Sequence, residues 1–247
     1  MRSALFWSSL PFLLPQALYV RQTAPRFAPA AGPTSGAVGE GTQRTLLAIG
    51  DSIVAGVGAS ELPKAMVGQT ASALATSLEC RVNWQALGVS GYTSTKILEG
   101  LLPKLPAAPA DFIVVSMGVN DVTGLTTVQQ WQRNVAELHD GLRAHSPDAR
   151  IAFVGLPPLH GFPLLPQPMR AVFGLRGRML DEALGNTIGD SANCKHVLIH
   201  FDPNTGKFAD DGYHPSEAGY AELGAQLAGE LYDLEFANTT KACETAA

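Results

Sequence analysis

The sequence predicts an α/β fold, a three-layer α/β/α arrangement around a central parallel sheet of five strands. From residue 43 onward, strand-like apolar runs alternate with helical stretches, and such alternation favours right-handed βαβ units with helices on both faces of the sheet. The run Asp111–Met117 is almost continuously apolar, as expected of a parallel strand buried on both faces. The length of 247 residues suits a single domain of this class.

Five short runs are expected to form the strands, and turn residues follow most of them. In chain order they are Thr45–Gly50, Arg81–Leu87, Asp111–Met117, Arg150–Gly155 and Val197–Phe201. Because all five are joined by helical crossovers or long connections, their carboxyl ends are expected at one edge of the sheet, where ligands bind in such folds.

Four stretches are expected to form helices, namely Lys64–Leu78, Thr95–Leu102, Thr127–His145 and Ser216–Leu231. The first gathers Ala, Met and Leu on one face, and Pro103 stops the second. The third is the clearest, because its apolar residues recur at near-helical spacing. Thr127 is a suitable N-cap for it, and Ser146-Pro147 a suitable end.

The chain divides into four segments. Residues 1–23 are an apolar N-terminal segment, and residues 24–42 are rich in Ala, Pro and Gly, as is typical of a linker. The main folded domain is expected over residues 43–235, and residues 236–247 form a C-terminal tail. No internal repeat is visible.

The N-terminal segment allows several interpretations. Residues 4–20 are strongly apolar and lie between arginines, but they are short for a membrane-spanning helix, and Pro11 and Pro15 are expected to kink or break one. The segment can act as an uncleaved membrane-associating stretch, as a poor signal peptide, or as an arm folded onto the domain. It favours a membrane-associated, periplasmic or secreted location over a cytoplasmic one.

Composition excludes several functions. The formal net charge of −5 gives no basic surface for nucleic acid. Three cysteines without a CxxC motif argue against a metal site and a disulfide framework, although one disulfide remains open. Gly56-Val57-Gly58 lacks the third glycine of a dinucleotide-binding loop, and no P-loop motif is present.

Ser52 stands directly after the first strand, in Gly50-Asp51-Ser52. A serine on a sharp turn from strand to helix can expose its hydroxyl, with backbone N–H groups directed at whatever binds there. The alternative is a serine that only caps or closes the turn.

Asp211 and His214 are three residues apart, just before a helix opened by Pro215. At that spacing the carboxylate can accept a hydrogen bond from one imidazole nitrogen and leave the other free to act as a base. The alternative is an Asp-His turn that caps the helix.

Two further residues follow predicted strands. Asn120 can offer an amide donor to an oxyanion, and Gly91 permits close approach of a backbone N–H to a ligand. Each is an ordinary turn residue when considered alone. Together with the serine and the Asp-x-x-His motif, they supply every part that acyl transfer requires.

With these motifs, residues Thr45 to about Leu231 resemble the SGNH hydrolases of the GDSL esterase/lipase family, specifically its bacterial lysophospholipase-like and short-chain esterase branch. Ile53 stands where the family usually has Leu. The resemblance implies a flavodoxin-like SGNH hydrolase fold.

The resemblance also implies roles for individual residues. Ser52 corresponds to the nucleophile, Asp211 to the orienting acid and His214 to the general base. The oxyanion hole corresponds to the Ser52 N–H, Gly91 and Asn120. Asp51 is expected to hold the turn rather than to react.

The implied function is a serine esterase that hydrolyses carboxylic esters, with short- to medium-chain acyl or lysophospholipid-like substrates, through an acyl-enzyme on Ser52. No metal or organic cofactor is required, and the partner is a small-molecule or lipid ester. The alternatives are a carbohydrate O-deacetylase or a thioesterase of the same fold, and a catalytically dead ligand-binding module.

The connection Leu156–Phe173 is apolar for an exposed loop. One hypothesis is that Leu156, Leu159, Phe162 and Leu165 wall an acyl pocket or touch lipid. The other is that the loop buries its apolar side chains against the sheet edge.

Overall fold

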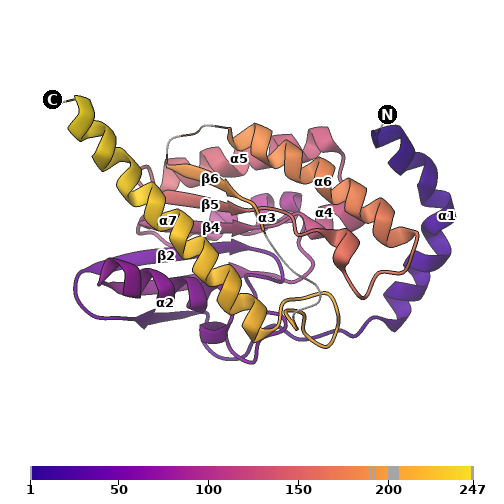
Figure 1. Ribbon diagram of the computed structural model, residues 1–247, viewed down its shortest axis with the longest axis horizontal. Helices are drawn as coiled ribbons and strands as arrows, with labels where there is room; N and C mark the ends of the chain where they lie inside the picture. Colours follow the sequence, from indigo (N-terminus) through magenta and orange to yellow (C-terminus); the bar gives the residue numbers. More distant parts are fainter. Residues whose placement is uncertain (1, 190, 192, 200–205, 246–247) are drawn as a thin grey trace.

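A computed structural model describes residues 2–189, 191, 193–199 and 206–245, and the side chains of residues 2–5, 21 and 238–245 are excluded from that description. A six-stranded sheet forms the centre, with strand order β1-β3-β2-β4-β5-β6 (Figure 1). The strands are β1 (Ser35–Val38), β2 (Gln43–Gly50), β3 (Arg81–Gly88), β4 (Phe112–Ser116), β5 (Arg150–Val154) and β6 (Cys194–Val197). The five strands from β2 to β6 are parallel to one another, which confirms the predicted fold class.

Helices cover both faces of the sheet. The α-helices are α1 (Arg2–Thr23), α2 (Met66–Leu78), α3 (Ser94–Gly100), α4 (Val119–Thr123), α5 (Val128–His145), α6 (Met169–Ile188) and α7 (Glu217–Thr245), and short 3-10 turns lie at Leu62–Lys64, Leu102–Lys104 and Leu159–Gly161. Helices α3, α5 and α6 lie on one face of the sheet, and α2 and α7 on the other (Figure 1). Side chains of the first group pack in one core cluster, and those of the second group in another.

The alternation of side chains along β4 explains why both cores form. Phe112 and Val114 belong to the cluster on the α2/α7 face, while Ile113 and Val115 belong to the cluster on the opposite face. Every residue of this strand is buried, and its sequence is apolar from Phe112 to Val115, before Ser116 at its carboxyl end.

Strand β1 lies within the segment expected to be a linker. It pairs antiparallel with β3 at the edge of the sheet, and Gly36 lies against the ring of Trp84. The predicted linker over residues 24–42 thus contains a strand that the sequence pattern did not indicate, because Ser35–Val38 is only four residues long and consists mostly of small residues. The parallel part of the sheet still has the five strands expected.

Helix α6 was not expected from the sequence. Its glycines lower its intrinsic helix propensity and weaken its amphipathic pattern, but they permit close packing. A Cβ on Gly174 would lie 2.7 Å from the Cβ of His160, and one on Gly185 would lie 2.8 Å from the His196 ring. Tertiary packing against the 3-10 turn and β6 therefore accounts for this helix.

The last strand also differs from the prediction. It ends at Val197, where the predicted strand Val197–Phe201 begins, and residues 200–201 lie outside the described residues. Of the predicted tail 236–247, the portion up to Thr245 continues helix α7. Cys80 and Cys194 are buried and free, and the side chain of Cys243 is not described.

The N-terminal segment forms one helix, α1, that continues through Pro11 and Pro15. It packs beside α6, on the other side of the molecule from the C-terminal end of α7 (Figure 1). Phe6 and Leu13 of α1 are fully buried in the core cluster. Among the helices of the described residues, none is both long and apolar enough to span a membrane.

Candidate active site

Ser52 lies in the turn after β2, at the carboxyl edge of the sheet. Gly50 makes this turn possible, because a Cβ there would lie 1.9 Å from the backbone oxygen of Ser116. The Asp51 N–H donates to that same oxygen at 3.1 Å, which ties the turn to the neighbouring strand β4. Ser52 is 8% exposed, so its hydroxyl meets a sheltered site rather than open solvent.

Asp211 organises the turn that carries His214. One carboxylate oxygen, Oδ1, accepts hydrogen bonds from the Tyr213 and His214 backbone N–H groups at 2.9 Å each. The other, Oδ2, lies 2.6 Å from His214 Nδ1. The three-residue spacing read from the sequence therefore places the carboxylate against the imidazole, as predicted.

His214 joins this turn to Ser52 across 162 positions of sequence. Its Nε2 lies 3.0 Å from Ser52 Oγ. With Nδ1–H donating to Asp211, Nε2 is the nitrogen that accepts the serine proton. The three side chains thus form one continuous series of hydrogen bonds from carboxylate to hydroxyl.

The charge on Asp211 is held by its hydrogen bonds. Burial acts to raise the pKa of Asp211, but the hydrogen bonds from the His214 side chain and from the His214 and Tyr213 backbone outweigh it, so that this pKa lies below its usual value. The carboxylate therefore stays ionised at neutral pH, and this fixes the orientation of the imidazole.

Asn120 lies near both Ser52 and Gly91. Its Nδ2 donates to the backbone oxygen of Tyr92 at 3.0 Å and to Asp51 Oδ2 at 3.3 Å. The amide thus connects the loop that follows β3 to the turn that follows β2. The structure brings the three predicted oxyanion donors, Ser52, Gly91 and Asn120, to neighbouring loops.

Gly91 adopts a φ of +81°, a conformation that side chains with a Cβ rarely take. No heavy atom lies within 4 Å of the position that a Cβ would occupy, so the glycine serves the backbone conformation and not a tight contact. The Tyr92 N–H closes this turn on Val89 at 3.2 Å.

Asp51 differs from Asp211 in its electrostatics. It is 2% exposed, and burial raises its pKa to about 7, although the hydrogen bond from the Ile53 N–H and the charge of His214 act against the rise. Its Oδ1 accepts from that N–H at 3.1 Å and shapes the turn around Ser52. This position agrees with the expected turn-holding role.

Asp121 is fully buried and holds the Asn120 loop to the start of α3. Its carboxylate accepts from the Ser94 N–H at 2.9 Å, from Ser94 Oγ at 2.6 Å and from Thr126 Oγ1 at 2.8 Å. Sequence analysis assigned it no role. Its position directly after Asn120 could have indicated a structural role, because a carboxylate buried there needs several hydrogen-bond donors.

A pocket opens beside Ser52 and His214, and most of its lining is apolar. The apolar and aromatic residues that line it are Ile53, Met117, Val119, Val154, Pro157, Phe162, Ile199, Phe208, Tyr213, Pro215 and Leu223. The ring of Phe162 meets Phe208 and Tyr213 edge-on, with centroids 5.2 and 5.3 Å apart. These three aromatic rings form one wall of the pocket.

Of the four residues expected to contact substrate, the structure places only Phe162 in the lining of this pocket. Leu156, Leu159 and Leu165 are buried in the core cluster that also contains residues of α1 and α6. The reason is helix α6, which the sequence did not reveal and which covers the apolar side of the loop. Tyr213, Phe208 and Ile199 were missed because the chain around them has no regular periodicity.

In the part of the chain that the structure describes, no group of three or more His, Cys, Asp or Glu side chains is placed to hold a metal ion. The polar groups at the carboxyl edge pair with one another and with backbone instead.

Comparisons with known proteins agree with this geometry. The model of the GDSL-like Lipase/Acylhydrolase family matches residues 48–222. No curated protein matches the chain. Among solved structures, the lipase Lip_vut3 from a goat rumen metagenome has 18% identity and a TM-score of 0.60, over 77% of this chain and 97% of that one.

Two other solved structures extend the comparison. The crystal structure of TesA has 26% identity and a TM-score of 0.55, over 77% of this chain and 99% of that one. The Clostridium thermocellum family 3 carbohydrate esterase has 18% identity and a TM-score of 0.55, over 82% and 99%. Since the family model covers most of the chain, including Ser52 and His214, this protein belongs to the GDSL-like lipase/acylhydrolase family of hydrolases.

Proposed function

We propose that this protein is a serine hydrolase of carboxylic esters that works through an acyl-enzyme on Ser52. One observation carries the proposal: the hydrogen-bonded series from Asp211 through His214 to Ser52 Oγ, at 2.6 and 3.0 Å, ends in an apolar pocket. A serine hydroxyl is a weak nucleophile, and an adjacent oriented base is what activates it.

In the acylation step, His214 Nε2 removes the Ser52 proton as Oγ attacks the ester carbonyl. Asp211 keeps the imidazole in the required tautomer and stabilises its positive charge. Collapse of the tetrahedral intermediate transfers the proton from His214 to the leaving alcohol. Water then enters, His214 activates it, and attack on the acyl-serine releases the acid and restores the Ser52 hydroxyl.

The oxyanion of each tetrahedral intermediate accepts hydrogen bonds from the Ser52 and Gly91 N–H groups and from the Asn120 amide. The Asn120 amide has two N–H groups. One keeps its 3.0 Å hydrogen bond to the backbone oxygen of Tyr92. The other leaves its longer contact with Asp51, at 3.3 Å, and donates to the oxyanion. Donors of this kind stabilise the transition state more than the ground state.

The pocket lining favours an apolar substrate portion. Its wall of Phe162, Phe208 and Tyr213 suits a short- to medium-chain acyl group or the chain of a lysophospholipid-like ester. The carbohydrate O-deacetylase and thioesterase alternatives use the same catalytic residues and differ in the group bound beside them. A non-catalytic binding module would not need the alignment of His214 with Ser52.

A panel of substrates tests the proposal. p-Nitrophenyl esters from acetate to decanoate, an acyl-coenzyme A thioester and an acetylated xylan are compared, with Ser52→Ala as the blank. We expect ester turnover that depends on chain length and exceeds turnover of the thioester and the acetylated sugar. Turnover confined to acetylated xylan would select the deacetylase, and no Ser52-dependent turnover of any substrate would refute the proposal.

Replacement of Phe162 identifies the pocket that sets chain length. We expect Phe162→Ala to shift the preferred acyl length upward, because it shortens one wall of the pocket. Phe173→Ala is a matched control, since Phe173 is buried in the core and is absent from the pocket lining.

A further inference from the structure

Helix α1 is apolar on both of its faces. Its inner stripe, Phe6, Leu10, Leu13, Ala17 and Val20, packs against the core of the domain. Its outer face carries exposed large apolar side chains at Phe12, Leu14, Leu18 and Tyr19, with Phe12 81% exposed, and Trp7 lies at the boundary between the two faces. A helix with apolar residues all round is normally buried on every side, so the exposed outer face of α1 is expected to bind a partner.

The inner face is firmly attached to the domain. Gln16 donates to the backbone oxygen of Gln167 at 2.6 Å and accepts from the Met169 N–H at 3.0 Å. The guanidinium of Arg176, which is 1% exposed, lies over the rings of Phe6 and Trp7 at 5.0 and 5.8 Å. Helix α1 is therefore fixed along the side of the domain, and its outer face points away from it.

The charge of the N-terminal residues indicates what kind of partner can bind the outer face of α1. Residues 1–39 contain Arg2, Arg21 and Arg26 and no Asp or Glu, whereas the whole chain has a net charge of −5. Exposed aromatic and aliphatic side chains flanked by arginines suit the interface of a bilayer that contains anionic lipids. In a symmetric dimer formed through this face, the same arginines of the second copy would lie opposite, so a second copy offers no charge complement there.

The same helix is tied to the loops of the candidate site. Beyond its end, the Ala30 and Ala31 N–H groups donate to the backbone oxygens of Ala55 and Ser60, in the loop that follows Ser52. Gln16 holds the segment that leads into α6, a few residues after Phe162 of the pocket wall. A surface that binds α1 therefore lies beside these loops.

We propose that the outer face of α1 docks on an anionic lipid bilayer, with the helix lying in the plane of the interface and the domain above it. The docked helix holds the pocket loops next to the bilayer. Docking itself does not depend on the proposed esterase activity; only the supply of lipid esters from the bilayer to Ser52 rests on that proposed function.

The test uses the full chain and sedimentation with phosphatidylcholine vesicles, with and without phosphatidylglycerol. We expect binding to vesicles that contain phosphatidylglycerol, at least about tenfold tighter than to phosphatidylcholine alone, because residues 1–39 carry three arginines and no acidic residue. Phe12→Ser/Tyr19→Ser should weaken that binding at least about tenfold, since two large apolar groups leave the interface.

A matched control removes the same two residue types elsewhere. Tyr232 and Phe236 form an exposed aromatic pair on α7, with ring centroids 4.7 Å apart. Tyr232→Ser/Phe236→Ser should bind vesicles within about twofold of the unmodified chain. Thermal unfolding of both variants verifies that the domain is intact.

Three results would overturn the proposal: no binding of the unmodified chain to anionic vesicles, equal binding by the Phe12→Ser/Tyr19→Ser variant, or equal loss of binding in both double variants. A chain that self-associates through α1 in solution and ignores vesicles would assign the face to a second copy instead. Turnover of a water-soluble ester, measured on the same samples, reports on the proposed function separately from docking.

Discussion

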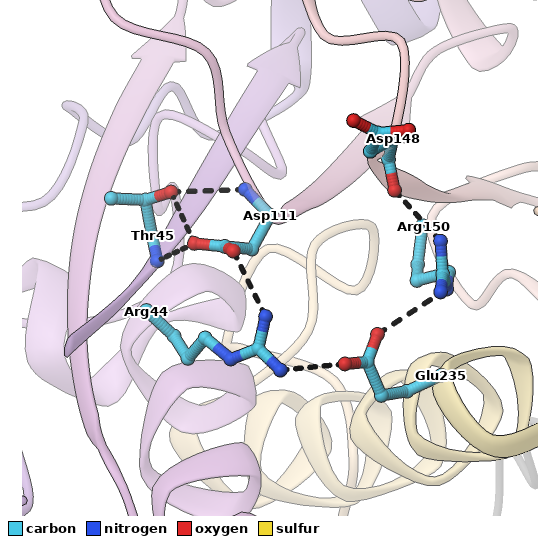
Figure 2. A network of polar contacts seen from close by, with 6 residues as sticks. All are labelled: Arg44, Thr45, Asp111, Asp148, Arg150 and Glu235. Atoms are coloured by element: carbon cyan, nitrogen blue, oxygen red, sulfur yellow. Dashed lines mark hydrogen bonds and ion pairs between the residues drawn. The ribbon is translucent and has the colours of Figure 1, made fainter. Parts of the chain in front are cut away.

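The two edges of the sheet carry similar residue types arranged for different purposes. At the amino edge, Asp111 accepts from Arg44 at 3.0 Å and from the Thr45 N–H and Oγ1 at 2.7 and 2.8 Å (Figure 2). Glu235 of α7 joins Arg44 at 2.6 Å to Arg150 at 3.3 Å. The carboxylates of Asp111 and Glu235 each have a cationic partner and some access to solvent.

At the carboxyl edge, Asp51 and Asp211 are 2% and 3% exposed, and no Lys or Arg of the described residues lines the pocket beside them. Hydrogen bonds and the His214 imidazole take the place of cations. Asp111 and Glu235 face arginines, which keep their protons, so these pairs stabilise the fold. Asp211 faces a histidine, which can take up and release a proton at its other nitrogen, as the proposed chemistry requires.

The largest expected difference between the two edges comes from replacing one aspartate at each edge by asparagine. Asp211→Asn should lower kcat/KM for a soluble ester by roughly 10³- to 10⁴-fold, because the imidazole loses its orienting carboxylate. Asp111→Asn should leave kcat/KM within about twofold and lower the free energy of unfolding instead. Steady-state kinetics and urea unfolding of both variants test this prediction. Equal losses of kcat/KM in the two variants would contradict the proposed difference between the edges.

Asn120→Ala should lower kcat by about 10²- to 10³-fold with little change in KM, because the lost donor acts mainly on the transition state. The kcat and KM of the variant are measured on the same ester. A rise in KM at unchanged kcat would show that Asn120 binds the ground state and not the oxyanion.

Asp51 supplies a prediction about pH. Its pKa is raised from 3.8 to about 7, so between these values the folded chain holds a proton that the unfolded chain has lost. Stability should therefore fall as pH rises from about 4 to 7, by an amount on the order of a few kcal/mol relative to Asp51→Asn. Urea unfolding across this range measures it, and parallel pH curves for the two chains would contradict it.

The smallest effect is expected at the amino edge. Glu235→Gln leaves the side-chain volume almost unchanged but weakens the ion pairs with Arg44 and Arg150, so the free energy of unfolding should fall by about 1 kcal/mol. High salt should reduce the difference. Ester turnover within about twofold is expected, and a tenfold loss would mean that the two edges are coupled.

The residues proposed to be catalytic could be identified from the sequence because each one lies in a short motif, at a strand end for Ser52 and Asn120 and before the last helix for Asp211 and His214. Parallel topology then places Ser52, Asn120 and the Asp211–His214 turn at one edge, whatever the details of packing. The distances could not be predicted, since the 3.0 Å contact between His214 and Ser52 depends on how α7 packs on the sheet.

The pocket was predicted less well for a physical reason. Whether Leu156, Leu159 and Leu165 face substrate or core depends on the presence of α6. The glycines of that helix weaken its amphipathic pattern, so the sequence did not predict it. The small residues of β1 give no strand signal either, because antiparallel pairing with β3 and contact with Trp84 stabilise it. Local pattern fails where tertiary contact decides the structure.

The central claim is that His214 makes Ser52 the single reactive nucleophile, and covalent labelling tests it most directly. An alkyl fluorophosphonate is added to the unmodified chain, to Ser52→Ala and to His214→Ala, and intact mass and peptide mapping follow. One adduct on Ser52 is expected, with none in Ser52→Ala and labelling slowed at least about 10³-fold in His214→Ala. Equal labelling of all three chains, or an adduct on another residue, would contradict the claim.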